Sequence, residues 1–125
     1  MKVFVQYLAV AGAGALGAVA RLAIGQVCFR LFATSFPIGT MIINITGSLF
    51  LGWFAIAGPR WMLSDTTRIA IAVGFVGAYT TFSTFMFDSD RLLRDGAVLQ
   101  SGMNIILSLV LGLAAVRLGI WLAGG

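Results

Sequence analysis

Uncharged polar side chains recur at helical spacing within two of the most apolar stretches of the sequence. They are Thr40, Asn44 and Ser48 in one stretch and Ser101, Asn104 and Ser108 in the other. Residues three, four or seven positions apart share one face of a helix, so each set forms a polar stripe. Such a stripe either bonds to a neighbouring helix, at about 0.6 kcal/mol per hydrogen bond, or lines a pathway for a small ion. Two stripes in one short chain favour the pathway.

Residues 74–85 combine two glycines, Gly74 and Gly77, with a dense cluster of hydroxyl side chains that follows them. The cluster consists of Thr80, Thr81, Ser83 and Thr84. Glycine and threonine are poor helix formers, and Ser and Thr side chains compete for backbone hydrogen bonds. We therefore predict a helix that is interrupted in mid-membrane, where non-helical backbone is tolerated only inside protein or beside a cavity. Freed carbonyl oxygens suit a hard cation, and freed N–H groups at the start of the second half-helix suit an anion.

Phe82 and Phe85 lie three positions apart, so their rings share one helix face. Phenylalanine at this spacing is as often plain core packing as anything else. The edge of the ring, however, carries the positive end of its quadrupole. Ring edges beside hydroxyl groups and an amide would bind a small, hard anion without a full positive charge. A full charge would bind it too tightly, and conduction requires release.

The charged residues are weaker signals. Arg21 either reaches the membrane surface or pairs with helix-end carbonyls, or else it draws anions into a vestibule. Asp88 at the end of the third apolar run is placed to pair with Arg91 three positions later. Neither an acid nor a lysine lies centrally in an apolar run, which excludes the proton-relay chemistry of pumps and antiporters.

Composition indicates what must position these groups. Of the 125 residues, 60% are hydrophobic and 10% are charged, with a mean hydropathy of +1.04, whereas soluble domains carry about 25% charged residues. This excludes an ordinary soluble enzyme and a disordered chain. The pI of 10.3 arises from eight scattered basic residues, which form no stripe for nucleic acid. Histidine is absent and Cys28 is alone, so a zinc site and a disulfide framework are excluded as well.

The spacing of the charges predicts one all-α integral membrane domain, residues 1–125, with four transmembrane helices. We expect the spans at about 3–32, 38–58, 69–91 and 96–120, each long enough for the roughly 17–25 residues that cross a bilayer. The first run ends in Ala18-Val19-Ala20, which resembles a signal-peptide cleavage site. It is longer than the usual apolar region of about 7–15 residues, so we interpret it as a span that is retained.

Basic residues near the span ends are almost balanced between the two sides of the membrane. One side would hold Lys2, Arg60, Arg68 and Arg117, and the other Arg30, Arg91 and Arg94. Orientation follows such counts. Either one residue decides it and the near-tie is noise, or the chain inserts both ways and forms an antiparallel pair. Four helices are few for enclosing a pathway, which favours the dimer.

The sequence closely resembles the Fluc (CrcB) family of bacterial fluoride channels over essentially its whole length. The resemblance includes Gly17-Ala18 followed by Arg21, then Gly39-Thr40 with Asn44, Gly47 and Ser48, and later Asn104 and Ser108. Its most specific part is residues 77–85, Gly-Ala-Tyr-Thr-Thr-Phe-Ser-Thr-Phe, which match the family's G-x-x-T-T-F-S-T-F signature.

The resemblance implies a dual-topology antiparallel homodimer with two fluoride pores and a central Na⁺ that is not transported. By position, the backbone carbonyls of Gly77 and Thr80 would hold the Na⁺, and Arg21 would lie in a vestibule. The fluoride pore would be lined by Phe82, Phe85 and Asn44, and less directly by Thr40, Ser83, Thr84, Asn104 and Ser108. The chain departs from the family pattern at Ala78, often Gly, at Asp88, often Glu, and at Asn104, where relatives vary.

The function implied is passive export of cytoplasmic fluoride, not enzymatic catalysis, by a multi-pass protein of the bacterial inner membrane. Its partners would be fluoride, lipid and a second copy of itself, and not nucleic acid. One alternative is a small dual-topology multidrug or cation transporter, but that chemistry needs a carboxylate in the first span, and none is present. The other alternative is a structural membrane subunit, which would explain the glycines but not two polar stripes beside a broken helix.

Overall fold

The computed structural model describes residues 1–125, and every regular element in it is helical. The elements are α1 (Lys2–Leu31), α2 (Ile38–Arg60), α3 (Asp65–Ile69), the π-helical η1 (Ala70–Val76), α4 (Gly77–Tyr79), α5 (Phe82–Arg94) and α6 (Val98–Leu122). Four helical segments are long and apolar enough to cross a membrane, the third being the run from Asp65 to Arg94. The prediction of an all-α protein with four membrane-spanning helices is confirmed.

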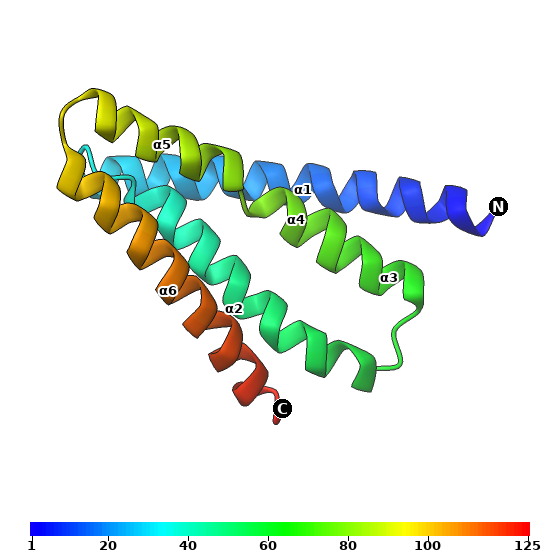
Figure 1. Cartoon of the computed structure of the whole chain (residues 1–125). Coiled ribbons are helices and arrows are strands. Elements are labelled where there is room, and N and C mark those ends of the chain that lie inside the picture. The colour runs from blue at the N-terminus through cyan, green and yellow to red at the C-terminus, as the bar shows by residue number, and fades with distance from the viewer.

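The helices form two pairs (Figure 1). The long α1 runs beside α3, η1 and α4, while α2 and α6 lie side by side and slant away from them, and α5 packs against α6. Glycines allow the close approach in both pairs. A side chain at Gly17 would collide with the carbonyl of Phe75, and one at Gly119 would collide with the carbonyl of Leu49. Backbones that approach this closely are typical of helix packing in membranes.

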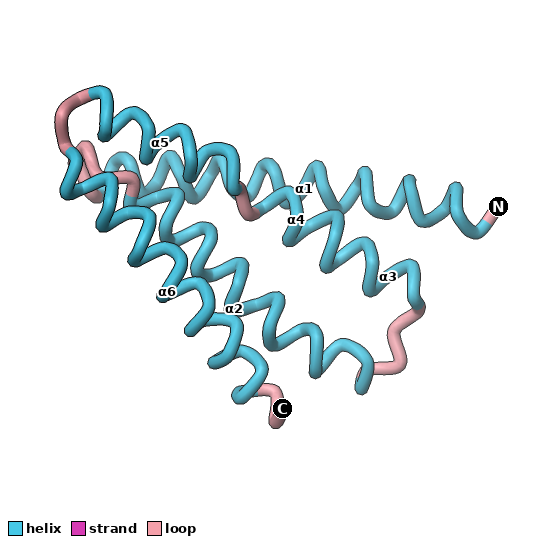
Figure 2. Tube along the Cα trace, viewed as in Figure 1, coloured by secondary structure: helices cyan, strands magenta, loops and turns pink.

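The third membrane-spanning segment is broken, as the sequence predicts, and Figure 2 shows the break as a short loop between α4 and α5. Thr80 and Thr81 have extended backbone torsions, with ψ of 157° and 115°. The glycines before them stay helical, since Gly77 has φ −61° and ψ −36°. Gly74 instead lies against the backbone of Val10 in α1. The interruption therefore comes from the threonines and their partners, and not from glycine flexibility.

Two helices run slightly beyond the ends expected from the sequence. Pro59 lies in the last turn of α2, which ends at Arg60 and not at 58, and α5 continues past 91 to Arg94. Asp90 pairs with Arg94 at 2.8 Å, and such pairs four positions apart support a helix end. The chain then turns at Gly96, whose φ of +77° lies in the left-handed region that favours glycine.

Most of the apolar surface faces outward. Only Gly17 and Cys28 of the 30 residues in α1 are buried. The outward side chains of α1 and α6 include many large aliphatic and aromatic residues. An apolar exterior of this extent requires lipid or another apolar surface around it.

Candidate functional site

The centre of the site is a clamp between α2 and the break in the third segment. The side-chain Nδ2 of Asn44 donates to the carbonyl of Thr81 at 3.0 Å, and the backbone N–H of Thr81 donates to Asn44 Oδ1 at 2.8 Å. An amide side chain has the donor and the acceptor that one peptide unit needs. The two bonds replace helical hydrogen bonds, so the extended backbone at Thr81 is satisfied inside the bundle.

The break deprives the backbone carbonyls of Gly77 and Thr80 of their helical donors. In an uninterrupted helix, the N–H of Thr81 would bond to Gly77, and the N–H of Thr84 would bond to Thr80. Here the first goes to Asn44, and the second donates to Thr81 Oγ1 at 3.2 Å. The carbonyls of Gly77 and Thr80 have therefore lost their helical donors, and such oxygens are ligands that hard cations accept.

Neighbouring groups hold the end of the first half-helix. Arg21 Nε donates to the carbonyl of Ala78 at 3.0 Å, which places a cation at a helix C-terminus, where it is electrostatically favourable. The hydroxyl of Tyr79 lies 2.8 Å from Thr46 Oγ1. Because Thr46 donates its own proton to the carbonyl of Ile42, Tyr79 is the donor in this pair. The pattern of residues gave no indication of a role for Thr46.

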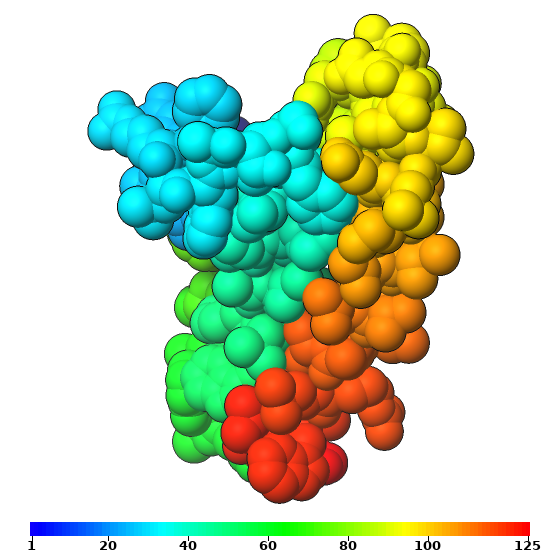
Figure 3. All heavy atoms as spheres, turned by 90° about the vertical axis from the view of Figure 1, so that its left-hand side faces the viewer, coloured from blue at the N-terminus to red at the C-terminus, as the bar shows by residue number.

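A large hollow, about 930 Å³, lies among α1, α2 and α5. Figure 3 shows the molecular surface indented between the cyan end of α1 and the yellow turn that joins α5 to α6. The charged residues that line this hollow are Arg21, Arg30, Arg91 and Asp88. Three cations against one acid give the hollow a net positive lining, which attracts anions.

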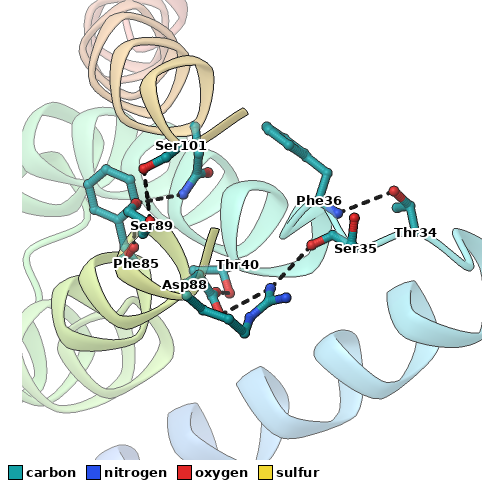
Figure 4. Close-up of polar contacts among 10 residues, drawn as sticks. Thr34, Ser35, Phe36, Thr40, Phe85, Asp88, Ser89 and Ser101 are labelled. Carbon is teal, nitrogen blue, oxygen red and sulfur yellow. Dashed lines mark hydrogen bonds and ion pairs between the residues drawn. The ribbon is translucent and has the colours of Figure 1, made fainter. Parts of the chain in front are cut away.

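The single acid of this hollow is already engaged (Figure 4). Thr40 Oγ1 donates to Asp88 Oδ2 at 2.9 Å. Arg91 lies 3.9 Å from Asp88 and donates to the carbonyl of Ser35 at 3.2 Å. The pairing of Asp88 with Arg91 expected from their spacing is therefore present. The bond from Arg91 to Ser35 also joins α5 to the loop between α1 and α2. Sequence spacing does not reveal this contact.

The smaller hollow, about 370 Å³, lies between α2, α5 and α6. Its polar and aromatic lining consists of Asn44, Ser48, Thr81, Phe82, Phe85 and Ser108. The rings of Phe82 and Phe85 meet edge to face, with centroids 6.1 Å apart and planes at 74°. This hollow holds polar groups and ring edges but no formal charge. Thr81 lines both hollows, so the clamp residue stands between them.

The two phenylalanines differ in burial. Phe85 is 5% exposed, whereas Phe82 is 72% exposed. Phe85 is therefore a wall of the bundle interior, and Phe82 presents most of its ring to whatever lies outside this chain.

The remaining candidates lie at different places. Thr40 and Thr84 line the larger hollow. Ser83 is exposed and lies 3.5 Å from Thr81 Oγ1. Asn104 is 1% exposed and lines neither hollow, because it bonds to Ser89 on α5 instead. Sequence reasoning missed Ser89, whose only signal is its position four residues after Phe85.

Comparison with known proteins gives one family model and relatives that share one name. The family model described as CrcB-like protein, Camphor Resistance (CrcB), matches residues 8–120. A protein of Nitrobacter hamburgensis named fluoride-specific ion channel FluC 1 is 48% identical over 114 residues, 90% of each chain. A fluoride-specific ion channel FluC of Vibrio cholerae is 39% identical over 87% of this chain and 88% of its own. A fluoride-specific ion channel FluC 2 of Mycobacterium tuberculosis is 44% identical over 88% and 84%.

Proposed function

This chain belongs to the CrcB family, and on that premise we propose that it is a fluoride-specific ion channel which exports fluoride passively. It is a multi-pass membrane protein of bacteria and not an enzyme. One observation carries the proposal on the structural side. Two hollows share Thr81 in their walls, the larger with a net positive lining and the smaller with neutral donors and ring edges.

The two linings suit successive tasks. The arginines of the larger hollow raise the local concentration of anions. The smaller hollow offers hydroxyl donors and the positive edges of Phe82 and Phe85 in place of water. Binding without a full charge is strong enough for entry and weak enough for exit, as conduction requires.

The driving force for export comes from the membrane itself. Fluoride enters from acidic surroundings as neutral HF and loses its proton at cytoplasmic pH, which traps it as an anion. An inside-negative potential favours outward movement of one negative charge by about 2.3 kcal/mol per 100 mV. A passive channel therefore suffices, and no coupling to a second solute is needed.

The working unit we propose is an antiparallel pair of identical chains. Phe82 lines the smaller hollow while 72% of it remains exposed, so a second copy would complete the wall that this chain leaves open. The near-balance of basic residues on the two sides supports insertion in both orientations.

At the centre of this pair we propose a bound Na⁺. The carbonyls of Gly77 and Thr80 fit this ion, because their helical donors are engaged by Asn44 and Thr81 and hard cations favour oxygen ligands. A bound Na⁺ supplies a fixed positive charge and holds the freed carbonyls together. Arg21 and Asn44 keep the broken backbone in the conformation that presents them.

Ion efflux from liposomes tests the function. Purified protein should release fluoride much faster than chloride from vesicles loaded with either ion at equal concentration. Vesicles without protein give the background rate. Chloride efflux comparable to fluoride efflux would contradict fluoride selectivity, and efflux of neither ion would contradict the channel.

A further inference from the structure

A buried cluster of hydrogen bonds joins α5 to α6 behind the smaller hollow. Figure 4 shows Ser89 of α5 facing Ser101 of α6. Ser101 Oγ donates to the carbonyl of Ser89 at 2.8 Å, and Asn104 Nδ2 donates to Ser89 Oγ at 2.9 Å. All three residues are at most 3% exposed. Every buried polar side-chain atom has a partner, so the cluster is fully bonded.

Both ends of this cluster reach the hollow. Ser89 Oγ donates to the carbonyl of Phe85 at 2.8 Å, and Ser108 Oγ donates to Asn104 Oδ1 at 3.4 Å. Phe85 and Ser108 line the hollow, whereas Asn104 does not. The side chain of Asn104 thus links the backbone of Phe85 on α5, through Ser89, to the hydroxyl of Ser108 on α6.

We propose that Asn104 is a positioning residue of the fluoride pathway, which acts through the hydroxyl of Ser108. This inference rests on the proposed function and replaces a lining role for Asn104 with an indirect one. Asn104 Oδ1 accepts from Ser108 Oγ at 3.4 Å, which is longer than the usual O–H···O bond, so its hold on the Ser108 proton is weak. An ion in the hollow must draw that proton away from the amide, so the hydroxyl binds the ion less tightly than a free hydroxyl would.

Weakened binding at this point favours conduction. A hydroxyl with a free proton would form a charge-assisted bond to fluoride, and such bonds are roughly twice as strong as neutral ones. A competing acceptor reduces that gain without removing the donor. The other end of the same amide is anchored on Ser89, which keeps Oδ1 within reach of Ser108.

The test measures single-channel conductance in planar bilayers as a function of fluoride concentration. Asn104→Leu keeps the side-chain size and removes the amide. It strands no buried donor, because Ser89 Oγ still donates to Phe85. The half-saturating fluoride concentration should fall about threefold, as the loss of one weak competing hydrogen bond implies. The maximal conductance should fall as well, because the ion leaves more slowly.

Ser101→Ala is the matched control. It removes one hydrogen bond between the same two helices in the same buried layer, but that bond is outside the path from Phe85 to Ser108. Its fluoride dependence should equal that of the wild type. An equal shift in both variants would mean that Asn104 only joins the helices, which would overturn the inference.

A double-mutant cycle shows whether Asn104 acts through Ser108. Ser108→Ala should raise the half-saturating concentration, and Asn104→Leu should change nothing further in that background. A shift that persists without the Ser108 hydroxyl, or none in Asn104→Leu alone, overturns the inference.

A second variant covers the case in which Asn104→Leu does not fold by gel filtration. Asn104→Ser is too short to reach both partners, so the same results are expected of it. Wild-type protein that passes no fluoride overturns the proposed function itself, whereas a conducting wild type with an unshifted Asn104→Leu overturns only this inference.

Discussion

The side chain of Asn44 bonds to both the N–H and the C=O of Thr81, 37 residues further along the chain. This pair determines where the third membrane segment stops being helical. The same pair diverts the N–H of Thr81, which would otherwise donate to the carbonyl of Gly77. One amide therefore shapes the break, frees a carbonyl and holds Thr81, which lines both hollows.

Replacing Asn44 tests the clamp. Asn44→Asp keeps the shape but removes the donor and sets an oxygen against the carbonyl of Thr81. Breaking a partly buried hydrogen bond of this kind and leaving its partner unpaired costs about 1–3 kcal/mol, so we expect a lower melting temperature and strongly reduced fluoride efflux. Ser48→Ala, one turn further on the same face, is the control and should melt like the wild type. An Asn44→Asp variant with normal stability and efflux would show that the clamp is dispensable.

The two phenylalanines should respond differently to Ile, which keeps apolar bulk and removes the ring edge. Phe85→Ile should lower stability by about 0.5–3 kcal/mol because Phe85 is buried, whereas Phe82→Ile should not destabilise the single chain. Both should lose fluoride efflux while remaining folded by gel filtration.

Phe87 is the control for the phenylalanine variants. It is exposed and lies under the guanidinium of Arg94, 5.6 Å from its ring centroid, away from both hollows. Phe87→Ile should conduct normally. Folded variants at both Phe82 and Phe85 with undiminished fluoride currents would falsify the ring-edge mechanism.

Added lysines test the antiparallel pair. Trp61 and Met62 in the turn after α2 are exposed, and replacing both with Lys gives one side two more positive charges at the loss of the edge contact between Trp61 and Trp53. A C-terminal tag should be accessible from both sides of the membrane in the wild type and from one side in the variant, with loss of efflux. A wild-type tag accessible from only one side is incompatible with the pair.

Sodium should stabilise the protein as well as support conduction. A ligand at one hundred times its dissociation constant adds about 2.7 kcal/mol to the free energy of unfolding. The melting temperature should therefore rise with NaCl more than with an equal concentration of KCl. Thr80→Val keeps the carbonyl and loses only the bond from Oγ1 to Val76, so it should keep this difference. Identical melting in both salts, with full efflux in Na⁺-free solution, would argue against the ion.

Length, hydropathy and local composition determined the architecture. Four apolar runs bounded by charges correspond to four membrane-spanning helices, because a helix in lipid satisfies its own backbone and needs only enough apolar residues. The hydroxyl cluster after Gly77 likewise predicted a broken third segment. The polar stripe of Thr40, Asn44 and Ser48 was visible from helical periodicity alone.

The tertiary structure decided what each polar group does. Periodicity placed Asn44 and Asn104 in equivalent stripes, yet Asn44 clamps a peptide beside both hollows and Asn104 is buried behind one of them. The structure also shows that the break lies at Thr80 and Thr81 and that the glycines before it are helical. The reason is physical: a hydrogen bond is made within about 3 Å. Which residues far apart in the chain come that close depends on how the four helices pack against one another.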